Sequence, residues 1–157
     1  MIKQLHTIKK SVSQTRIFLL AALAMVSFSA NAQLSGNVTI DTLSAASSTN
    51  FKSFGSFRNK LVQSGVSGAV VVTVKNGPYT EQVDIPQISS MNSTRTVTIK
   101  GKLQTLKFSS SNAYARYTRR LNGADYFTFD SLNIRAEGSS YAVGVHLKNN
   151  ADYNTFK

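Results

Sequence analysis

A repeat near the C-terminus constrains the fold more than any other feature of the sequence. The segment Asn122–Phe129 (NGADYFTF) returns as Asn149–Phe156 (NNADYNTF), with Asn, Ala, Asp, Tyr, Thr and Phe at matching positions. A repeat with this spacing is typical of stacked architectures, in which each turn of the chain lies on the previous one. Since the second copy runs to the end of the sequence, we expect further coils after Lys157 in the full-length protein.

Residues 1–32 are predicted to be a cleavable signal peptide. Four basic residues precede the apolar run Ile17–Phe28, and the small residues Ala30 and Ala32 fit a cleavage site after Ala32. The apolar run is shorter than the roughly 20 residues that span a bilayer. We therefore expect an exported protein, secreted or at the cell surface, with no membrane span after cleavage.

The charge of residues 33–157 indicates which partners to expect. The whole chain carries a formal net charge of +11, and removal of the four basic residues of the signal peptide leaves +7. A basic surface favours polyanions, and for an exported protein we expect acidic polysaccharide rather than nucleic acid. The sequence contains no cysteine, which excludes disulfides, thiol nucleophiles and thiolate metal sites.

One helix is predicted, close to the start of the mature chain. Residues 33–50 form a lead-in segment with one short strand, and the helix follows over Ser53–Gln63. Its apolar residues recur at helical spacing, Ser53 is a suitable N-cap, and Gly65 can end the helix. The apolar positions are Phe54, Phe57, Leu61 and Val62. We expect this helix to cap the first edge of a strand array.

From Ala69 onward the sequence predicts short strands. The run Ala69–Val74 is almost continuously β-branched, as in a strand packed on both faces. Further strand groups are predicted at 83–85, 96–99, 103–108, 126–129, 132–134 and 143–147, with another starting at Tyr153. A β-sandwich would account for such strands but would not require the repeat. We therefore predict an all-β fold, a right-handed parallel β-helix of about three coils with a short N-terminal capping helix, over residues 51–157.

The stretch from Asn50 to Ile85 resembles the N-terminal part of pectin-lyase-like β-helix proteins. The pattern Gly-x-Tyr-x-Glu-x-Val-x-Ile, which runs from Gly77 to Ile85, is similar to the opening coil of pectin methylesterases. The resemblance implies a β-helix over most of residues 51–157. That family carries a Gln before an Ala-Leu-Arg-Val strand; the comparable strand here is Ala142–Leu147, and Tyr141 stands where the Gln would be. The later catalytic motifs of the family would lie beyond Lys157.

A cluster of arginines and tyrosines is the main candidate binding segment. Residues 114–120 contain Arg116, Tyr117, Arg119 and Arg120. Arginine forks suit the carboxylates of acidic sugars, and tyrosine rings can stack on sugar rings. The alternative is a solvated, positively charged connecting loop.

The repeat itself supplies two further candidates. Tyr126 and Tyr153 are expected to stack, either as a platform for sugar rings or only as a contact between coils. Asp125 and Asp152 are expected on adjacent coils, where two carboxylates could hold calcium or act as an acid–base pair. The alternative is that each Asp binds backbone amides at a turn. No other cofactor or metal site is predicted, and the sole mature histidine, His146, is expected to point outward.

Two functions remain open from the sequence. The first is a secreted β-helix scaffold that contacts carbohydrate or a cell surface and has no complete active site. The second is the N-terminal part of a carbohydrate-active enzyme of the pectin esterase or lyase type, with its catalytic coils after Lys157. No catalytic residue is predicted within the chain itself.

Overall fold

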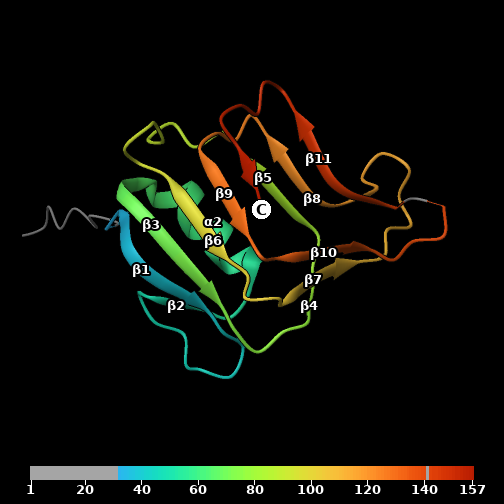
Figure 1. Cartoon of the computed structure of the whole chain (residues 1–157), viewed down its shortest axis with the longest axis horizontal. Helices are drawn as coiled ribbons and strands as arrows, with labels where there is room; N and C mark the ends of the chain where they lie inside the picture. Colours follow the sequence, from blue (N-terminus) through green and yellow to red (C-terminus); the bar gives the residue numbers. More distant parts are fainter. Residues whose placement is uncertain (1–31, 141) are drawn as a thin grey trace, which may run out of the picture. The chain divides into compact units, whose positions relative to one another are not determined.

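A computed structural model describes residues 32–140 and 142–157 of the chain (Figure 1). The predicted signal peptide falls on residues 1–31 and Ala32, so it lies almost entirely outside the described residues. Within the described part, no helix is long and apolar enough to cross a membrane. The described part consists mainly of strands, with a single helix.

The elements follow one another along the chain in short steps. The first elements are β1 (Leu34–Ile40), β2 (Asn50–Phe51), α2 (Phe54–Ser64), β3 (Val66–Val74), β4 (Tyr79–Thr80) and β5 (Val83–Pro86). They are followed by β6 (Val97–Lys100), β7 (Thr105–Phe108), β8 (Tyr117–Asn122), β9 (Phe127–Asp130), β10 (Asn133–Ala136), β11 (Val143–Lys148) and β12 (Thr155–Phe156).

These strands form three sheets, and all pairs within the sheets are parallel. The largest sheet has the order β12-β9-β6-β3-β1-β2, and we call it sheet A. Sheet B has the order β10-β7-β4, and sheet C has the order β11-β8-β5. The parallel pairing predicted from the repeat is therefore confirmed.

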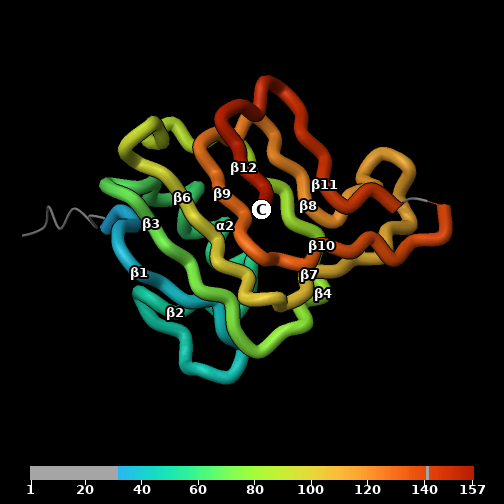
Figure 2. The backbone as a smooth tube through the Cα atoms, viewed as in Figure 1, coloured from blue at the N-terminus to red at the C-terminus, as the bar shows by residue number. Residues whose placement is uncertain are grey.

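The chain visits the three sheets in a fixed sequence. From β3 to β9, each strand pairs with the strand three places later, so the backbone passes from sheet A to B to C and returns to A (Figure 2). The register follows the repeat, because Thr155 pairs with Thr128 and Phe156 with Phe129. Equivalent residues of the two copies therefore lie above one another.

The predicted helix is confirmed as α2, with Ser53 as its N-cap and Gly65 at its end with φ of 67°. The Ser53 hydroxyl accepts a hydrogen bond from the Ser56 backbone N–H at 3.0 Å. Two further orphan N–H groups, those of Phe54 and Gly55, donate to the Glu81 carboxylate at 3.0 and 2.9 Å. Because a carboxylate at a helix N-terminus also complements the helix dipole, Glu81 fixes α2 to the strand array that follows it.

The motif from Gly77 to Ile85 is explained by structural roles. The buried Tyr79 hydroxyl donates to the Ile40 carbonyl at 3.0 Å and also contacts the Lys75 carbonyl. Glu81 caps the helix, and Val83 and Ile85 belong to the buried core. The side chains of the pattern thus stabilise the first coil.

The prediction of a lead-in segment over residues 33–50 needs correction. Strand β1 is an inner strand of sheet A, paired with both β2 and β3. Leu34, Val38 and Ile40 are buried in the core. The short strand predicted within residues 33–50 is thus confirmed as β1, but it belongs to the core of sheet A rather than to a separate lead-in segment.

Two details of packing also differ from prediction. Strand β3 alternates, with Val70, Val72 and Val74 buried and the residues between them half-buried, so it is not packed equally on both faces. In α2 the core residues are Phe54, Phe57 and Leu61, whereas Val62 is exposed. The core therefore lies between the inner faces of the sheets and one stripe of the helix.

Candidate functional site

Only the first part of the arginine–tyrosine segment, residues 114–116, lies in the connecting loop considered from the sequence. Tyr117–Asn122 is strand β8, in the middle of sheet C. Tyr117 and Arg119 are buried, so neither can serve as a surface contact, and this part of the binding prediction is wrong. Among these four candidates, Arg116 alone is exposed.

Arg119 lies inside the core. Alternation along β8 places it on the inner face, in register with Val83, and its guanidinium carbon lies 4.1 Å from the ring centre of Phe129 and 5.5 Å from that of Phe54. Its Nε and Nη1 atoms have no hydrogen-bond partner among the described residues. Burial lowers the pKa of Arg119 to about 9, and the charge of Glu81 opposes that shift only in part.

Arg120, the next residue, faces outward and is paired. Its Nε donates to Asp84 Oδ1 at 2.9 Å and its Nη2 to Asp84 Oδ2 at 2.5 Å, and the hydrogen bonds raise the pKa of Arg120. The guanidinium also covers the Tyr117 ring at 4.5 Å. Burial raises the pKa of Tyr117, and the charge of Asp84 adds to that effect. With its fork already occupied by a carboxylate, Arg120 is a poor ligand for an acidic sugar.

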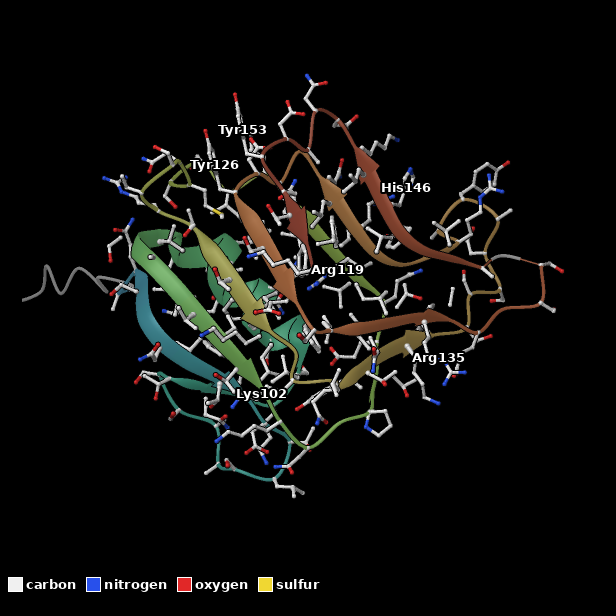
Figure 3. The ribbon with its side chains drawn as sticks, in the orientation of Figure 1. Lys102, Arg119, Tyr126, Arg135, His146 and Tyr153 are labelled. Carbon is white, nitrogen blue, oxygen red and sulfur yellow. The ribbon has the colours of Figure 1, made fainter. Side chains whose placement is uncertain are left out.

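His146 is exposed, as predicted, and lies in register with Arg120 on the outer face of sheet C (Figure 3). Its ring centre is 6.3 Å from that of Tyr117. The column Asp84, Arg120 and His146 therefore places three polar side chains on successive strands. Its only carboxylate is paired with Arg120, so Asp84 is not free to orient or activate His146 as a general base.

The predicted stacking of Tyr126 and Tyr153 is confirmed. Their ring centres are 4.8 Å apart with an angle of 5° between the planes, and both rings point the same way from the turns before β9 and β12 (Figure 3). Because the rings cover one another, one face of each ring is taken by the stack, while Tyr153 as a whole is 73% exposed. The pair acts first as a contact between coils.

Of the two aspartates of the repeat, Asp125 binds a backbone amide of the other copy. Asp125 Oδ1 accepts a hydrogen bond from the Asp152 backbone N–H at 2.7 Å, so its carboxylate binds the next coil rather than the other carboxylate. No group of three or more His, Asp or Glu residues that could hold a metal occurs in residues 32–140 and 142–157. Asp125 therefore agrees with the alternative only in that it binds a backbone amide, and this amide belongs to the next coil rather than to its own turn.

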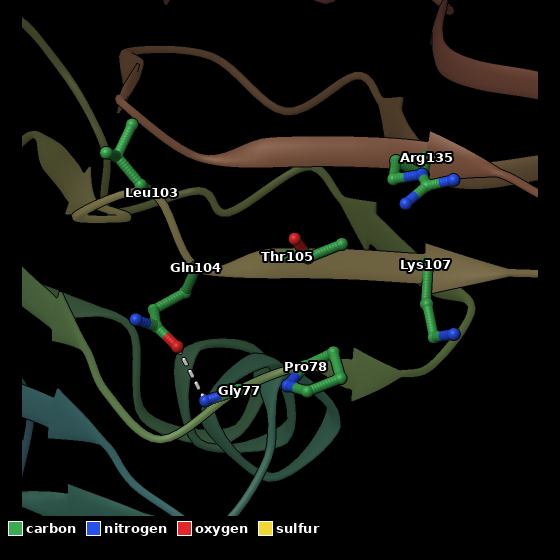
Figure 4. A pocket seen from close by; sticks show the side chains of 7 residues that line it. All are labelled: Gly77, Pro78, Leu103, Gln104, Thr105, Lys107 and Arg135. Atoms are coloured by element: carbon green, nitrogen blue, oxygen red, sulfur yellow. Dashed lines mark hydrogen bonds between the residues drawn. The ribbon is translucent and has the colours of Figure 1, made fainter.

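A groove on the outer face of sheet B is lined in part by charged residues. It has a volume of about 340 Å³ (Figure 4). Its lining residues are Gly77, Pro78, Leu103, Gln104, Thr105, Lys107 and Arg135. The Gln104 side-chain oxygen accepts a hydrogen bond from the Gly77 backbone N–H at 2.7 Å, which joins the loop before β4 to the start of β7.

Two cations stand side by side at this groove. Lys107 of β7 pairs in register with Arg135 of β10, so their backbones are about 4.8 Å apart. Lys107 forms a half-exposed salt bridge with Glu137 at 3.3 Å. Arg135 is exposed and forms no salt bridge with any residue that the structure describes.

Sequence reasoning misses this groove. Lys107 and Arg135 lie singly within apolar strands, whereas a dense cluster such as residues 114–120 gives the stronger sequence signal. The signal that could have found the groove is the repeat, because a spacing close to the repeat length brings the two side chains into neighbouring coils.

Comparisons with protein-family models, with curated proteins and with solved structures found no match for this chain. The site must therefore be interpreted from its own chemistry.

Proposed function

We propose that residues 51–157 form a right-handed parallel β-helix of about three coils, similar to the opening of pectin-lyase-like proteins. The support is the cyclic passage through three parallel sheets and the register between repeat copies. Right-handed winding is the usual hand of parallel crossover connections. Helix α2 serves as the cap of the first coil.

We further propose that the chain is an exported scaffold that binds acidic polysaccharide in the sheet B groove. The observation that carries this proposal is Arg135, which is exposed and forms no salt bridge with any described residue, next to Lys107 along the groove. The Lys107 ammonium has three donors, so its half-exposed pair with Glu137 leaves donors for a ligand. An ammonium and a guanidinium at neighbouring positions suit carboxylates on a sugar chain. The exported location and the formal charge of +7 after cleavage, from the sequence, agree with such a ligand.

The mixed polar and apolar lining of the groove also suits a sugar chain. It follows the end of sheet B where Gln104 and Thr105 supply polar contacts and Pro78 and Leu103 supply apolar surface. Carbohydrate sites use this mixture, because sugar rings have hydroxyl groups at the edge and C–H groups on the face. The second possibility, the front part of a pectin esterase or lyase, gains no support from a described residue.

The test is retention on polygalacturonate. We expect the protein to bind this acidic polymer and not dextran, a neutral one, with binding that weakens as salt rises. The double variant Lys107→Ala/Arg135→Ala should weaken binding at least about tenfold, since hydrogen bonds to charged groups contribute roughly 1.5–3 kcal/mol each.

The matched control is Lys60→Ala/Arg95→Ala. It removes the same charge from residues that do not line the groove. If both double variants lose binding equally, general basicity rather than the groove accounts for retention, and the proposal is wrong. Unchanged binding by Lys107→Ala/Arg135→Ala would also refute it.

A further inference from the structure

A second concave site lies close to the sheet B groove, on the turns that lead from sheet A to sheet B. It has a volume of about 230 Å³ and is lined by Lys100, Lys102, Asp130 and Ser131. Lys100 ends β6 and Asp130 ends β9, and these two residues are paired in register. The site therefore lies where the chain leaves sheet A, and we call it the corner site.

The corner site and the sheet B groove are joined through Leu103. This residue lines the groove, and its backbone N–H donates to the carbonyl of Ser131, a residue of the corner site, at 2.7 Å. From Leu103 the groove follows β7 as far as Lys107. Figure 3 shows Lys102 and Arg135 at opposite ends of sheet B. The two concave sites therefore adjoin at Leu103.

The turn that carries Lys102 and Leu103 is fixed by its backbone. Both residues have positive φ, 47° and 63°, which side chains other than glycine seldom adopt. The Gln104 N–H closes the turn by donating to the Gly101 carbonyl at 2.8 Å. A Cβ at Gly101 would lie 2.4 Å from the Cα of Leu132, so this turn packs directly on the turn of the next coil. The side chains of Lys102 and Leu103 are therefore presented from a defined position.

Positive charge lies at both ends of this surface. The corner site adds the exposed Lys100 and Lys102 to the two cations of the groove. Neither lysine forms a salt bridge with any residue that the structure describes. Asp130, the carboxylate of the corner site, accepts a hydrogen bond from the Ser131 hydroxyl at 2.9 Å. Both ends can therefore bind an anionic group.

Exposed apolar surface separates the two charged ends. Leu103 is 73% exposed, and the groove lining also contains Pro78. An inorganic anion would use only the cations of such a surface. A polymer of acidic sugars uses both features, because each residue has a carboxylate and a ring with C–H groups on its face. The order of charged, apolar and charged surface therefore favours a sugar chain that spans both sites.

We propose that the corner site and the sheet B groove together bind several consecutive residues of one acidic polysaccharide chain. This inference rests on the proposed function of the groove and adds the length of the ligand. One part of the sugar chain places a carboxylate at Lys107 and Arg135. A middle residue packs on Leu103, and a further carboxylate reaches Lys100 and Lys102.

The spacing of the two charged ends requires more than one sugar. The strand from Thr105 to Lys107 alone spans about 7 Å at the usual rise per residue. Lys102 lies before the start of this strand, so the corner site is farther from Lys107 than Thr105 is. A sugar with a single carboxylate therefore occupies one end at a time, whereas a longer oligomer engages both and gains affinity from the second contact.

The experiment is calorimetric titration of the full chain with the trimer and the hexamer of galacturonic acid. We expect the hexamer to bind at least about tenfold more tightly than the trimer. The corner variant Lys100→Ala/Lys102→Ala should remove this advantage and leave trimer binding unchanged, because the trimer is held at Lys107 and Arg135. The control Lys60→Ala/Arg95→Ala removes the same charge from residues that line neither site, and it should leave the advantage intact.

Leu103→Asn tests the apolar contact, since Asn tolerates the positive φ at this position and keeps the turn. It should weaken hexamer binding at least about threefold and leave trimer binding unchanged. Leu43→Asn is the matched control, because Leu43 is 79% exposed and lines neither site. Equal losses of hexamer affinity in these two variants would overturn the apolar contact and with it the extended site.

The remaining outcomes separate this inference from the proposed function of the groove. Equal affinity for trimer and hexamer, with both lost in Lys107→Ala/Arg135→Ala, would overturn the extended site and leave the proposed function standing. Equal losses of hexamer affinity in the corner variant and in Lys60→Ala/Arg95→Ala would also overturn it, because general charge would then explain the effect. Binding of neither oligomer nor polygalacturonate would refute the proposed function itself, and the extended site with it.

Discussion

Similar apolar side chains are buried at one end of the strand array and exposed at the other. At the first coil, Phe54, Phe57 and Leu61 of α2 are at most 1% exposed. At the last described coil, Leu147 is 50% and Phe156 is 44% exposed. The residue types are alike, so the difference comes from what covers them.

The comparison shows that a stack of repeats cannot bury its own last coil. Each strand covers the coil below and exposes its own upper edge, so an element of another kind must close the array. At the first coil that element is α2, which the Glu81 carboxylate fixes in place through Phe54 and Gly55. At the other end, the described residues include only strands.

The largest effect that would sharpen this comparison is expected at Phe57. Phe57→Ala should lower the free energy of unfolding by about 3–5 kcal/mol, because it leaves a cavity under the helix. Phe156→Ala should cost only about 1 kcal/mol, since that ring is already partly in water. Urea denaturation monitored by circular dichroism measures both values.

Equal costs for the two variants would show that the two ends do not differ in stability, which would contradict the comparison. Val62→Ala serves as the control for helix propensity, because Val62 lies in the same helix but is exposed. Its unfolding free energy should change by only a few tenths of a kcal/mol.

The repeat and the helix are the parts of the fold that the sequence predicts well. The spacing between the repeat copies correctly indicates parallel strands and stacked tyrosines, because a strand that lies above its counterpart must share its register. Ser53, Phe57 and Leu61 likewise follow helical periodicity and capping rules. Both are local or periodic signals.

Strand β8 and the groove cannot be predicted in the same way. Sequence reasoning assigns Arg119 to the surface because charged residues are rarely buried, yet alternation along the strand directs it inward between Phe54 and Phe129. The groove depends on which outward side chains become neighbours across coils, as Lys107 and Arg135 do. Which side chains become neighbours across coils depends on the tertiary structure and cannot be derived from the amino-acid composition.

The second prediction concerns Arg119, whose guanidinium is buried in the core near Phe54 of α2. Arg119→Met should raise the free energy of unfolding by about 1–3 kcal/mol. The variant removes two unpartnered nitrogens and a buried charge, whose desolvation outweighs the contacts with Phe54 and Phe129.

Arg120→Met is the comparison variant. It should leave the free energy of unfolding unchanged or lower it by up to about 1 kcal/mol. It breaks the half-exposed ion pair with Asp84 without removing any buried unpaired group. Chemical denaturation of both variants shows whether each substitution raises or lowers the free energy of unfolding. A loss of stability in Arg119→Met would mean that the stacked guanidinium is a net stabiliser of the core.

The smallest effect concerns Asp41, whose hydrogen bonds anchor the first coil and whose contribution to stability is lost in acid. Hydrogen bonds from Asn76, Ser44 and the Leu43 backbone lower the pKa of Asp41 to about 2, below its ordinary value of 3.8. A lowered carboxyl pKa stabilises the fold above about pH 4, and that stability is lost as the pH falls through 2. Asp41→Asn should therefore be less stable than the unmodified chain at pH 6, with a difference that shrinks between pH 4 and 2.

The measurement is urea unfolding of both proteins at pH 6, 4 and 2.5, with Asp130→Asn as the control for a general change in charge. Asp130 accepts a single side-chain hydrogen bond, from Ser131 at 2.9 Å, whereas Asp41 is held by three groups. If the stability difference for Asp41→Asn stays constant across this range, the hydrogen bonds at Asp41 do not favour its ionised form. The first coil would then be anchored mainly by its apolar contacts, and helix α2 alone would account for the contrast between the two ends.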